Sequence, residues 1–319
     1  MNTDLNYSAS LPVLVLAGPT ASGKSGLALR VAEELNGAVI NADSMQVYQD
    51  LHVLTARPSA DDEARAPHHL YGYLDSAVAC TVAVWLSRAV EIIRQVQGEG
   101  RLPIVAGGTG LYLKALMEGL SDIPDIPSAV KDTSRRMRLE DGNEALYASL
   151  KEKDPEGAAQ LKPNDRQRIL RAWEVVEATG TPLHVWQSKP IAPPLGETQF
   201  YKVLFRPPRE DLYAACDGRF EAMLERDALE EVQALQRRGL DPSLPAMKAL
   251  GVPELAAFLN GEISREEAVT RAQQHTRNYA KRQTTWFRTQ FSASETLNTQ
   301  YSERLFEEIF PKIRSLVLT

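Results

Sequence analysis

The chain has 319 residues, of which 43% are hydrophobic and 24% are charged, and these proportions exclude wholesale disorder and fibrous repeats. Its formal net charge is −6, so a nucleic-acid partner would have to bind a local basic patch rather than the surface at large. With only two cysteines, Cys80 and Cys216, the chain has neither a disulfide framework nor a cysteine metal cluster.

The first part of the chain alternates short apolar runs with amphipathic segments. Strands are predicted over residues 11–17, 38–42 and 102–106, and helices over residues 26–35, 82–96 and 111–118. Glycine-rich turns follow the first and third of these strands. The alternation predicts an α/β fold with a parallel sheet, in which ligands bind at the carboxyl ends of the strands.

A different pattern begins near residue 121. Strand signals vanish up to residue 198, where helix-forming residues dominate and prolines recur. A strand over residues 201–205 and long helices over residues 210–237 and 265–288 follow. We therefore predict a discontinuous α/β core, residues 1–120 and 199–319, interrupted by a mostly helical insertion domain over residues 121–198.

Residues 18–25 match the pattern G-x-x-x-x-G-K-[ST] between a predicted strand and a predicted helix, the context that a phosphate-binding loop (P-loop) requires. Backbone N–H groups, the helix N-terminus and the Lys24 ammonium can bind phosphate oxygens, and the Ser25 hydroxyl can ligate Mg²⁺. The predicted phosphate-binding residues are Gly18, Pro19, Thr20, Ala21, Ser22, Gly23, Lys24 and Ser25. The motif alone permits either a nucleotide-dependent kinase or a transferase that binds a diphosphate ester.

Two further turns carry candidate site residues. Asp43 follows the second predicted strand, so its carboxylate should lie beside the phosphate loop, where it could accept a proton or hold Mg²⁺. An isolated aspartate would more simply cap the next turn. Thr109 follows two glycines at the end of the third strand, and by itself it indicates only a turn.

Together with the phosphate loop, seven further blocks make the chain resemble the bacterial tRNA dimethylallyltransferase family. They run from about residue 13 to residue 290 in the family's order. They are DSMQVY (43–48), TARP (55–58), PHHL (67–70), GGTGLY (107–112), NDRQRILRA (164–172), LPAMKALG (244–251) and AKRQTTWF (280–287).

The resemblance implies transfer of a dimethylallyl group from dimethylallyl diphosphate to the exocyclic amine of adenosine 37, just 3′ of the anticodon. The acceptors would be tRNAs that read codons starting with U, and diphosphate would be released. Asp43 would be the base, Thr109 would lie where the flipped adenine meets the donor, and Arg219 would contact the diphosphate. The phosphate loop and Mg²⁺ would stabilise the leaving group.

The resemblance also implies contacts with the tRNA anticodon stem-loop, to which the insertion domain would contribute. Residues 271–288 carry five cations, no acidic residue and several aromatics, which suits phosphate contacts and base stacking. A solvated helix face with core aromatics would give the same pattern. Residues 131–138 and 162–171 each carry a net charge of +3. The predicted tRNA-binding residues are Asp43, Ser44, Met45, Gln46, Thr109, Lys131, Gln167, Arg168, Arg171, Lys281 and Arg282.

The chain departs from the family pattern at a few positions. Leu54 and Asp227 replace glycines, Ala215 replaces an arginine, and residues 251–254 read GVPE in place of GYRQ. We expect an Mg²⁺-dependent enzyme that acts as a monomer. We expect it in the cytoplasm, because residues 1–10 are polar and no apolar run approaches the roughly 20 residues of a membrane span. A P-loop small-metabolite kinase and a non-catalytic RNA-binding module are the alternatives.

Overall fold

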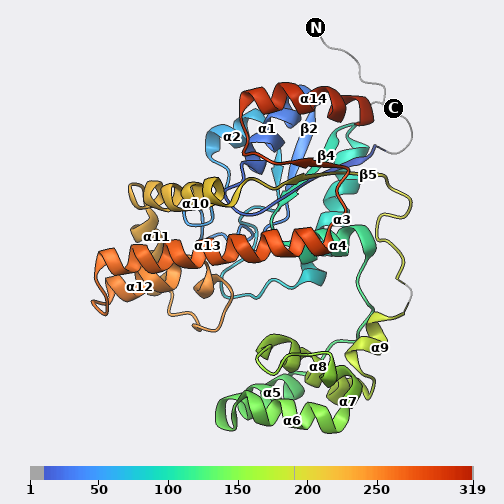
Figure 1. Cartoon of the computed structure of the whole chain (residues 1–319), viewed down its shortest axis with the longest axis vertical. Helices are drawn as coiled ribbons and strands as arrows, with labels where there is room; N and C mark the ends of the chain where they lie inside the picture. Colours follow the sequence, from blue (N-terminus) through green and yellow to red (C-terminus); the bar gives the residue numbers. More distant parts are fainter. Residues whose placement is uncertain (1–10, 190, 318–319) are drawn as a thin grey trace. The chain divides into compact units, whose positions relative to one another are not determined.

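The computed structural model describes residues 11–189 and 191–317, so the polar residues 1–10 lie outside the described part. The chain forms two compact units: a core of residues 1–117 and 193–319, and an insertion of residues 118–192 (Figure 1). The boundaries predicted from the sequence, after residues 120 and 198, lie slightly further along the chain. No helix in the described ranges is long and apolar enough to cross a membrane.

The core unit is built on a six-stranded parallel sheet, as the α/β prediction required. The strand order is β3-β2-β4-β1-β5-β6. The strands are β1 (Val13–Ala17), β2 (Gly37–Asn41), β3 (His68–His69), β4 (Leu102–Gly107), β5 (Phe200–Phe205) and β6 (Glu295–Leu297). The two short strands β3 and β6 lie at the edges, and the four longer strands match the predicted ones within two residues.

Helices cover both faces of the sheet, which explains why the two central strands, β1 and β4, are buried at every position. On one face Leu14 and Leu16 of β1 pack against α1 (Lys24–Glu34) and α14 (Glu303–Val317). On the other face Val13 and Val15 belong to the cluster formed by α3 (Val82–Gly98), α4 (Gly110–Glu118) and the helices that follow β5 (Figure 1). The phosphate loop, between β1 and α1, therefore lies at the carboxyl edge of a rigid sheet.

The predicted single helix over residues 210–237 is wrong. The chain instead forms α10 (Arg209–Leu224) and α11 (Ala228–Arg237), separated by a turn at residues 225–227. After the turn, the Glu231 carboxylate accepts hydrogen bonds from the backbone N–H groups of His52, Val53 and Leu54 at 2.6, 2.7 and 3.0 Å. This anchor to a distant loop, together with burial of Val232, sets the direction of α11, and neither is visible in local periodicity.

The remaining helices of the core unit are α2 (Ala60–Arg65), the 3₁₀ turn η1 (Ala246–Lys248), α12 (Val252–Leu259) and α13 (Arg265–Gln290). The long helix α13 starts at Ser264, whose hydroxyl accepts a hydrogen bond from Glu267 N–H. Its small residues Ala268, Ala272 and Ala280 are buried, which lets the helix pack closely along its whole length.

The insertion unit is helical. It contains α5 (Ser128–Glu140), α6 (Gly142–Lys153), α7 (Pro155–Ala159), α8 (Arg166–Thr179) and α9 (Leu183–Gln187). Its own core is formed by residues such as Leu146, Leu150, Ile169 and Trp173. Asp165 caps α8 by accepting a hydrogen bond from Arg168 N–H, so the NDRQR block marks a helix start.

Candidate active site

The phosphate loop contains residues with positive φ angles just before the start of α1. Gly23, with φ of +88°, is the N-cap of α1, and Ala21 also has a positive φ of +60°. The Lys24 ammonium donates a hydrogen bond to the Pro19 carbonyl at 3.1 Å. The Ser22 hydroxyl is buried and makes no hydrogen bond among the described residues. The loop thus brings N–H groups and a cation together at the first turn of α1.

Lys24 lies in a region of competing charges. Burial lowers the pKa of its ammonium from 10.5 to about 8. The Asp43 carboxylate opposes this shift and the Arg219 guanidinium adds to it. An anionic ligand would reverse the shift, because it stabilises the charged form of lysine.

This lowered pKa predicts a pH dependence for capture of the anionic donor. Lys24 is charged below about pH 8 and neutral above it, so kcat/KM for the donor should fall as pH rises through that value. At saturating donor the fall should move to higher pH, because the bound anion raises the pKa. Initial rates at limiting and at saturating donor would measure both profiles. A Lys24→Arg variant, whose cation does not titrate, should lose the fall, and a flat wild-type profile at limiting donor would contradict the assignment.

The second glycine turn, residues 107–110, packs against the turn that follows β2. Gly107 ends β4 against the backbone of Ala42, and a Cβ at this position would lie far inside van der Waals contact of the Ala42 carbonyl. Thr109 N–H donates to the same carbonyl at 3.1 Å. The Thr109 Oγ1 atom accepts from Ser44 N–H at 2.9 Å, so Thr109 ties the turn after β4 to the turn after β2.

Replacing Gly107 by Ala should destabilise the core unit by about 1–3 kcal/mol, because the added methyl meets backbone that cannot rotate away. Thermal unfolding would measure the loss. Gly98→Ala is the matched control: Gly98 ends α3, a Cβ there meets nothing within 4 Å, and Ala favours the helix. Equal melting temperatures for the two variants would refute this account of the turn.

Asp43 follows β2 and lines a cavity of the core unit. Its backbone N–H donates to Asn41 Oδ1 at 2.7 Å, and its own Oδ1 accepts from Met45 N–H at 2.9 Å. The carboxylate therefore caps the next turn, which was the simpler of the two interpretations, and also faces the cavity. The hydrogen bond to Oδ1 fixes the orientation of the Asp43 side chain, and Asp43 still lines the cavity.

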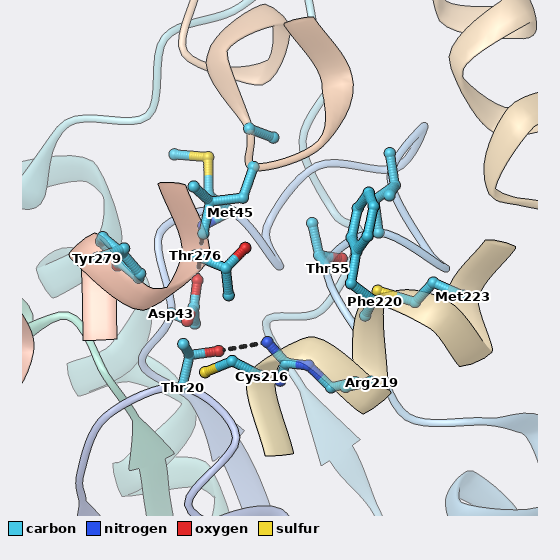
Figure 2. Close-up of a pocket in the computed structure, with 13 residues that line it drawn as sticks. Thr20, Asp43, Met45, Thr55, Cys216, Arg219, Phe220, Met223, Thr276 and Tyr279 are labelled. Atoms are coloured by element: carbon cyan, nitrogen blue, oxygen red, sulfur yellow. Dashed lines mark hydrogen bonds between the residues drawn. The ribbon is translucent and has the colours of Figure 1, made fainter. Parts of the chain in front are cut away.

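The cavity joins the phosphate loop to Asp43. Thr20 and Arg219 meet at one end, where Arg219 Nη2 donates to Thr20 Oγ1 at 2.6 Å; Asp43 and Tyr279 lie on one side, across from Phe220 and Met223 (Figure 2). The lining residues are Thr20, Asp43, Met45, Leu54, Thr55, Cys216, Arg219, Phe220, Met223, Ala249, Leu250, Thr276 and Tyr279. Cationic and hydroxyl groups at one end and an apolar wall beside them suit an anionic ester with a hydrocarbon tail.

Some predicted site residues lie beside this cavity rather than on its surface. Lys24, Ser25 and Thr109 are not among the lining residues. Lys24 is near enough to Asp43 for their charges to interact, and Thr109 reaches the site through Ser44. Ser25 is exposed in the first turn of α1.

Helix α13 contributes cavity residues that were not among the predicted site residues. Thr276 and Tyr279 line the cavity, one helical turn apart, and Gln283 lies one turn further along the same face. Burial raises the pKa of Tyr279, and the Asp43 carboxylate raises it further. The spacing 276, 279, 283 could have suggested a common face, but not which neighbour that face meets.

The aromatics near the end of α13 are core residues. Phe287 is 2% exposed, and the Trp286 ring packs so closely against Gly110 that a Cβ there would overlap it. Of the two interpretations left open by the sequence, base stacking and a place in the core, the structure supports the core for Phe287, and the Trp286 ring also packs against the protein. Two of the five cations are also paired: Arg277 with Asp217 at 2.7 Å, and Arg271 with Glu267.

The other predicted tRNA-binding residues fall into two groups. In the core unit, Met45 lines the cavity, and Lys281 and Arg282 are exposed on α13. The Gln46 amide nitrogen donates to the carbonyls of Thr55 and Ala56 at 2.8 and 3.0 Å, so it braces the loop that carries Thr55 to the cavity. In the insertion unit, three predicted residues lie exposed near the start of α8, and a fourth is partly buried on α5. The three are Gln167, Arg168 and Arg171, and the fourth is Lys131.

The departures from the family pattern also have structural outcomes. Leu54 lines the cavity. Glu254 is buried in the first turn of α12 and pairs with His275 Nδ1 on α13 at 2.5 Å. The altered segment thus holds α12 against α13, where Leu250 and Thr276 form part of the cavity wall.

The residues present fit a largely hydrated Mg²⁺ better than a protein-enclosed metal. Within residues 11–189 and 191–317, no three histidine, cysteine or acidic side chains cluster as a metal site. Ser25 supplies one exposed hydroxyl, and Asp43 supplies one carboxylate on the cavity wall. Mg²⁺ commonly keeps several waters and binds one or two protein oxygens together with the phosphates of a substrate.

Comparison with known protein families gives a consistent result. Residues 46–290, more than half of the chain, match the model of the IPP transferase family, and residues 11–74 match the isopentenyl transferase model. A tRNA dimethylallyltransferase of Rhodospirillum centenum is 54% identical over 286 residues, covering 90% of this chain and 91% of that protein. One from Rhodospirillum rubrum is 51% identical over 314 residues, covering 97% and 96%.

Solved structures share the fold. A tRNA isopentenylpyrophosphate transferase of Bacillus halodurans is 29% identical with a TM-score of 0.68, covering 96% of both chains. A eukaryotic dimethylallyltransferase acting on tRNA is 26% identical with a TM-score of 0.78, covering 95% of this chain and 80% of that one. These relatives do not support the small-metabolite kinase that the phosphate loop alone would permit. The chain belongs to the tRNA dimethylallyltransferase family, and it is a prenyltransferase enzyme with a parallel α/β core.

Proposed function

We propose that the chain transfers a dimethylallyl group from dimethylallyl diphosphate to the exocyclic amine of adenosine 37 in tRNAs that read codons starting with U. The observation that carries the proposal is the shared cavity, in which Thr20 and Arg219 lie at one end and Asp43 on one side (Figure 2). A donor whose diphosphate lies at the phosphate loop would direct its allylic carbon past the apolar wall toward Asp43.

In the reaction, the adenine nitrogen attacks the allylic carbon, the carbon–oxygen bond to diphosphate breaks, and the proton of the amine passes to Asp43. This amine is a weak nucleophile, because its lone pair is delocalised into the ring, so a positioned base assists as the bond forms. The hydrogen bond from Met45 N–H holds the carboxylate in orientation. We propose that Thr109 and Ser44, which are hydrogen-bonded at 2.9 Å, lie beside the acceptor adenine.

The departing diphosphate gains negative charge as the bond breaks. Lys24, Arg219 and the N–H groups of the phosphate loop would stabilise this charge without rearranging, because the fold has already placed them. We propose that Ser25 helps to hold Mg²⁺ beside the diphosphate, where the ion would neutralise part of the same charge. A bound anion would also raise the lowered pKa of Lys24 and so favour its charged form.

Acceptor tRNA has to present an unstacked base to this cavity. Extruding a base costs a few kcal/mol, which cationic contacts to the phosphate backbone can offset. Exposed cations on α13, Lys281 and Arg282, and those at the start of α8, Arg168 and Arg171, suit this role. We propose that the insertion unit contributes the latter contacts to the anticodon stem-loop. We also propose that the protein acts on tRNA as a monomer in the cytoplasm.

The function is tested by incubating the protein with Mg²⁺, dimethylallyl diphosphate and unmodified tRNA that carries adenosine 37. Mass analysis of the digested tRNA should find prenylated adenosine, and a matched tRNA with guanosine at that position should stay unmodified. Absence of product with several adenosine-37 tRNAs, or phosphoryl transfer from ATP to a small acceptor instead, would refute the proposal. Omitting Mg²⁺ should slow product formation. Binding of tRNA without diphosphate release would indicate the non-catalytic alternative.

A further inference from the structure

Gln283 joins the two glycine turns of the site. It is 5% exposed, and its Oε1 accepts a hydrogen bond from Thr20 N–H in the phosphate loop at 2.8 Å. Its Nε2 donates to the Gly108 carbonyl, one residue before Thr109, at 2.9 Å. One buried amide on α13 is therefore hydrogen-bonded both to the phosphate loop and to the turn that carries Thr109.

The surrounding structure is shaped for this contact. A Cβ at position 108 would lie far inside van der Waals contact of Gln283 Nε2, so the absence of a side chain at Gly108 is what lets the amide approach. Thr20 is held from its other side by Arg219, which donates to its hydroxyl at 2.6 Å. Releasing a buried amide from both partners leaves polar groups unsatisfied, so the bridge resists displacement.

We propose that Gln283 is a positioning residue that fixes the phosphate loop relative to the Thr109 turn. This inference rests on the proposed function. In that reaction the loop holds the leaving group, and Thr109 and Ser44 flank the acceptor base. Gln283 therefore sets the separation between the allylic carbon and the attacking nitrogen without touching either substrate. A misplacement of about 1 Å between reacting groups can cost about 100-fold in rate.

Gln283→Met, which removes both hydrogen bonds at similar side-chain size, provides the first test. The single-turnover rate of prenylation with both substrates saturating should fall at least about tenfold. The affinity for tRNA should stay close to wild type, because the exposed cations are unchanged. Gln290→Met is the control: it is the same change on the same helix, at an exposed residue. A wild-type single-turnover rate, or a loss of tRNA affinity equal to the loss of rate, would overturn the proposal.

Gln283→Glu provides a second test that also serves if the methionine variant does not fold. The introduced carboxylate can accept from Thr20 N–H but cannot donate to the Gly108 carbonyl, whereas the protonated carboxyl can do both. The rate relative to wild type should therefore be low near about pH 8 and rise as pH falls toward about 5.5, where a buried carboxyl begins to protonate. The ratio for Gln290→Glu should stay flat. A flat ratio for Gln283→Glu as well would contradict a bridging role.

Different results would refute the proposed function and the positioning role of Gln283. If wild-type protein does not prenylate tRNA, the proposed function is wrong. If wild-type protein is active and the Gln283 variants match it at every pH, the function stands and the positioning role is wrong.

Discussion

Asp43→Asn should lower the turnover of tRNA prenylation by about 10²–10⁴-fold, the usual contribution of a general base. The amide has the same size, and its oxygen can still accept the hydrogen bond from Met45 N–H, so the turn after β2 should stay intact. What is lost is the carboxylate that accepts the proton. Single-turnover rates with saturating donor and tRNA would measure the effect.

The binding of tRNA separates this role from a structural one. The affinity of Asp43→Asn for tRNA should stay close to wild type, whereas a disrupted turn would weaken binding and turnover together. Asp61→Asn, an exposed acidic residue in the first turn of α2, is the control for loss of one negative charge. If Asp43→Asn retained wild-type turnover, the proton would have to leave by another route.

Lys24→Met should lower kcat/KM for dimethylallyl diphosphate by about 10²–10³-fold, as removal of one preorganised charge-stabilising group does in other active sites. Part of the loss should appear in kcat, because the charge on the diphosphate grows as the carbon–oxygen bond breaks. Steady-state kinetics with varied donor at saturating tRNA would resolve the two components. Methionine keeps the length of the side chain, so α1 should form normally.

Lys312→Met is the matched control, since it removes the same charge from an exposed position on α14, where Lys312 pairs with Glu295 at 3.2 Å. It should leave donor kinetics unchanged. Should Lys24→Met raise KM for tRNA rather than for the donor, Lys24 would have to contact RNA instead of diphosphate.

Features that depend on neighbours along the chain were predictable from the sequence. The phosphate loop could be located because a buried strand, two glycines, a lysine and an amphipathic helix follow one another within about two dozen residues. Asp43 could be placed beside it because the carboxyl ends of adjacent parallel strands meet at one edge of a sheet. The helical character of residues 128–187 likewise follows from local composition.

Tertiary contacts decided the rest. The helical periodicity of the sequence continues through residues 225–227, but the helix breaks there in the structure, where Glu231 is anchored to a loop almost 180 positions away. The aromatics among the cations of α13 fitted either a base-stacking surface or a helix packed on the core, and the burial of Phe287 decided for the core. Gln283 stands in the AKRQTTWF block, but nothing in the sequence indicated its bridging role, since its two partners lie 263 and 175 positions away.

The sequence by itself determined the α/β core, the anion-binding loop and the strand end that carries the carboxylate, because each arises from bonds and packing among residues close together in the chain. Only the tertiary structure decided which face of α13 closes the cavity. It also decided which side chains of this helix are buried in the core, which cations stay exposed, and which residue bridges the two glycine turns. A helix specifies the spacing of its side chains but not the surface they meet, and that surface is built from segments brought together by folding.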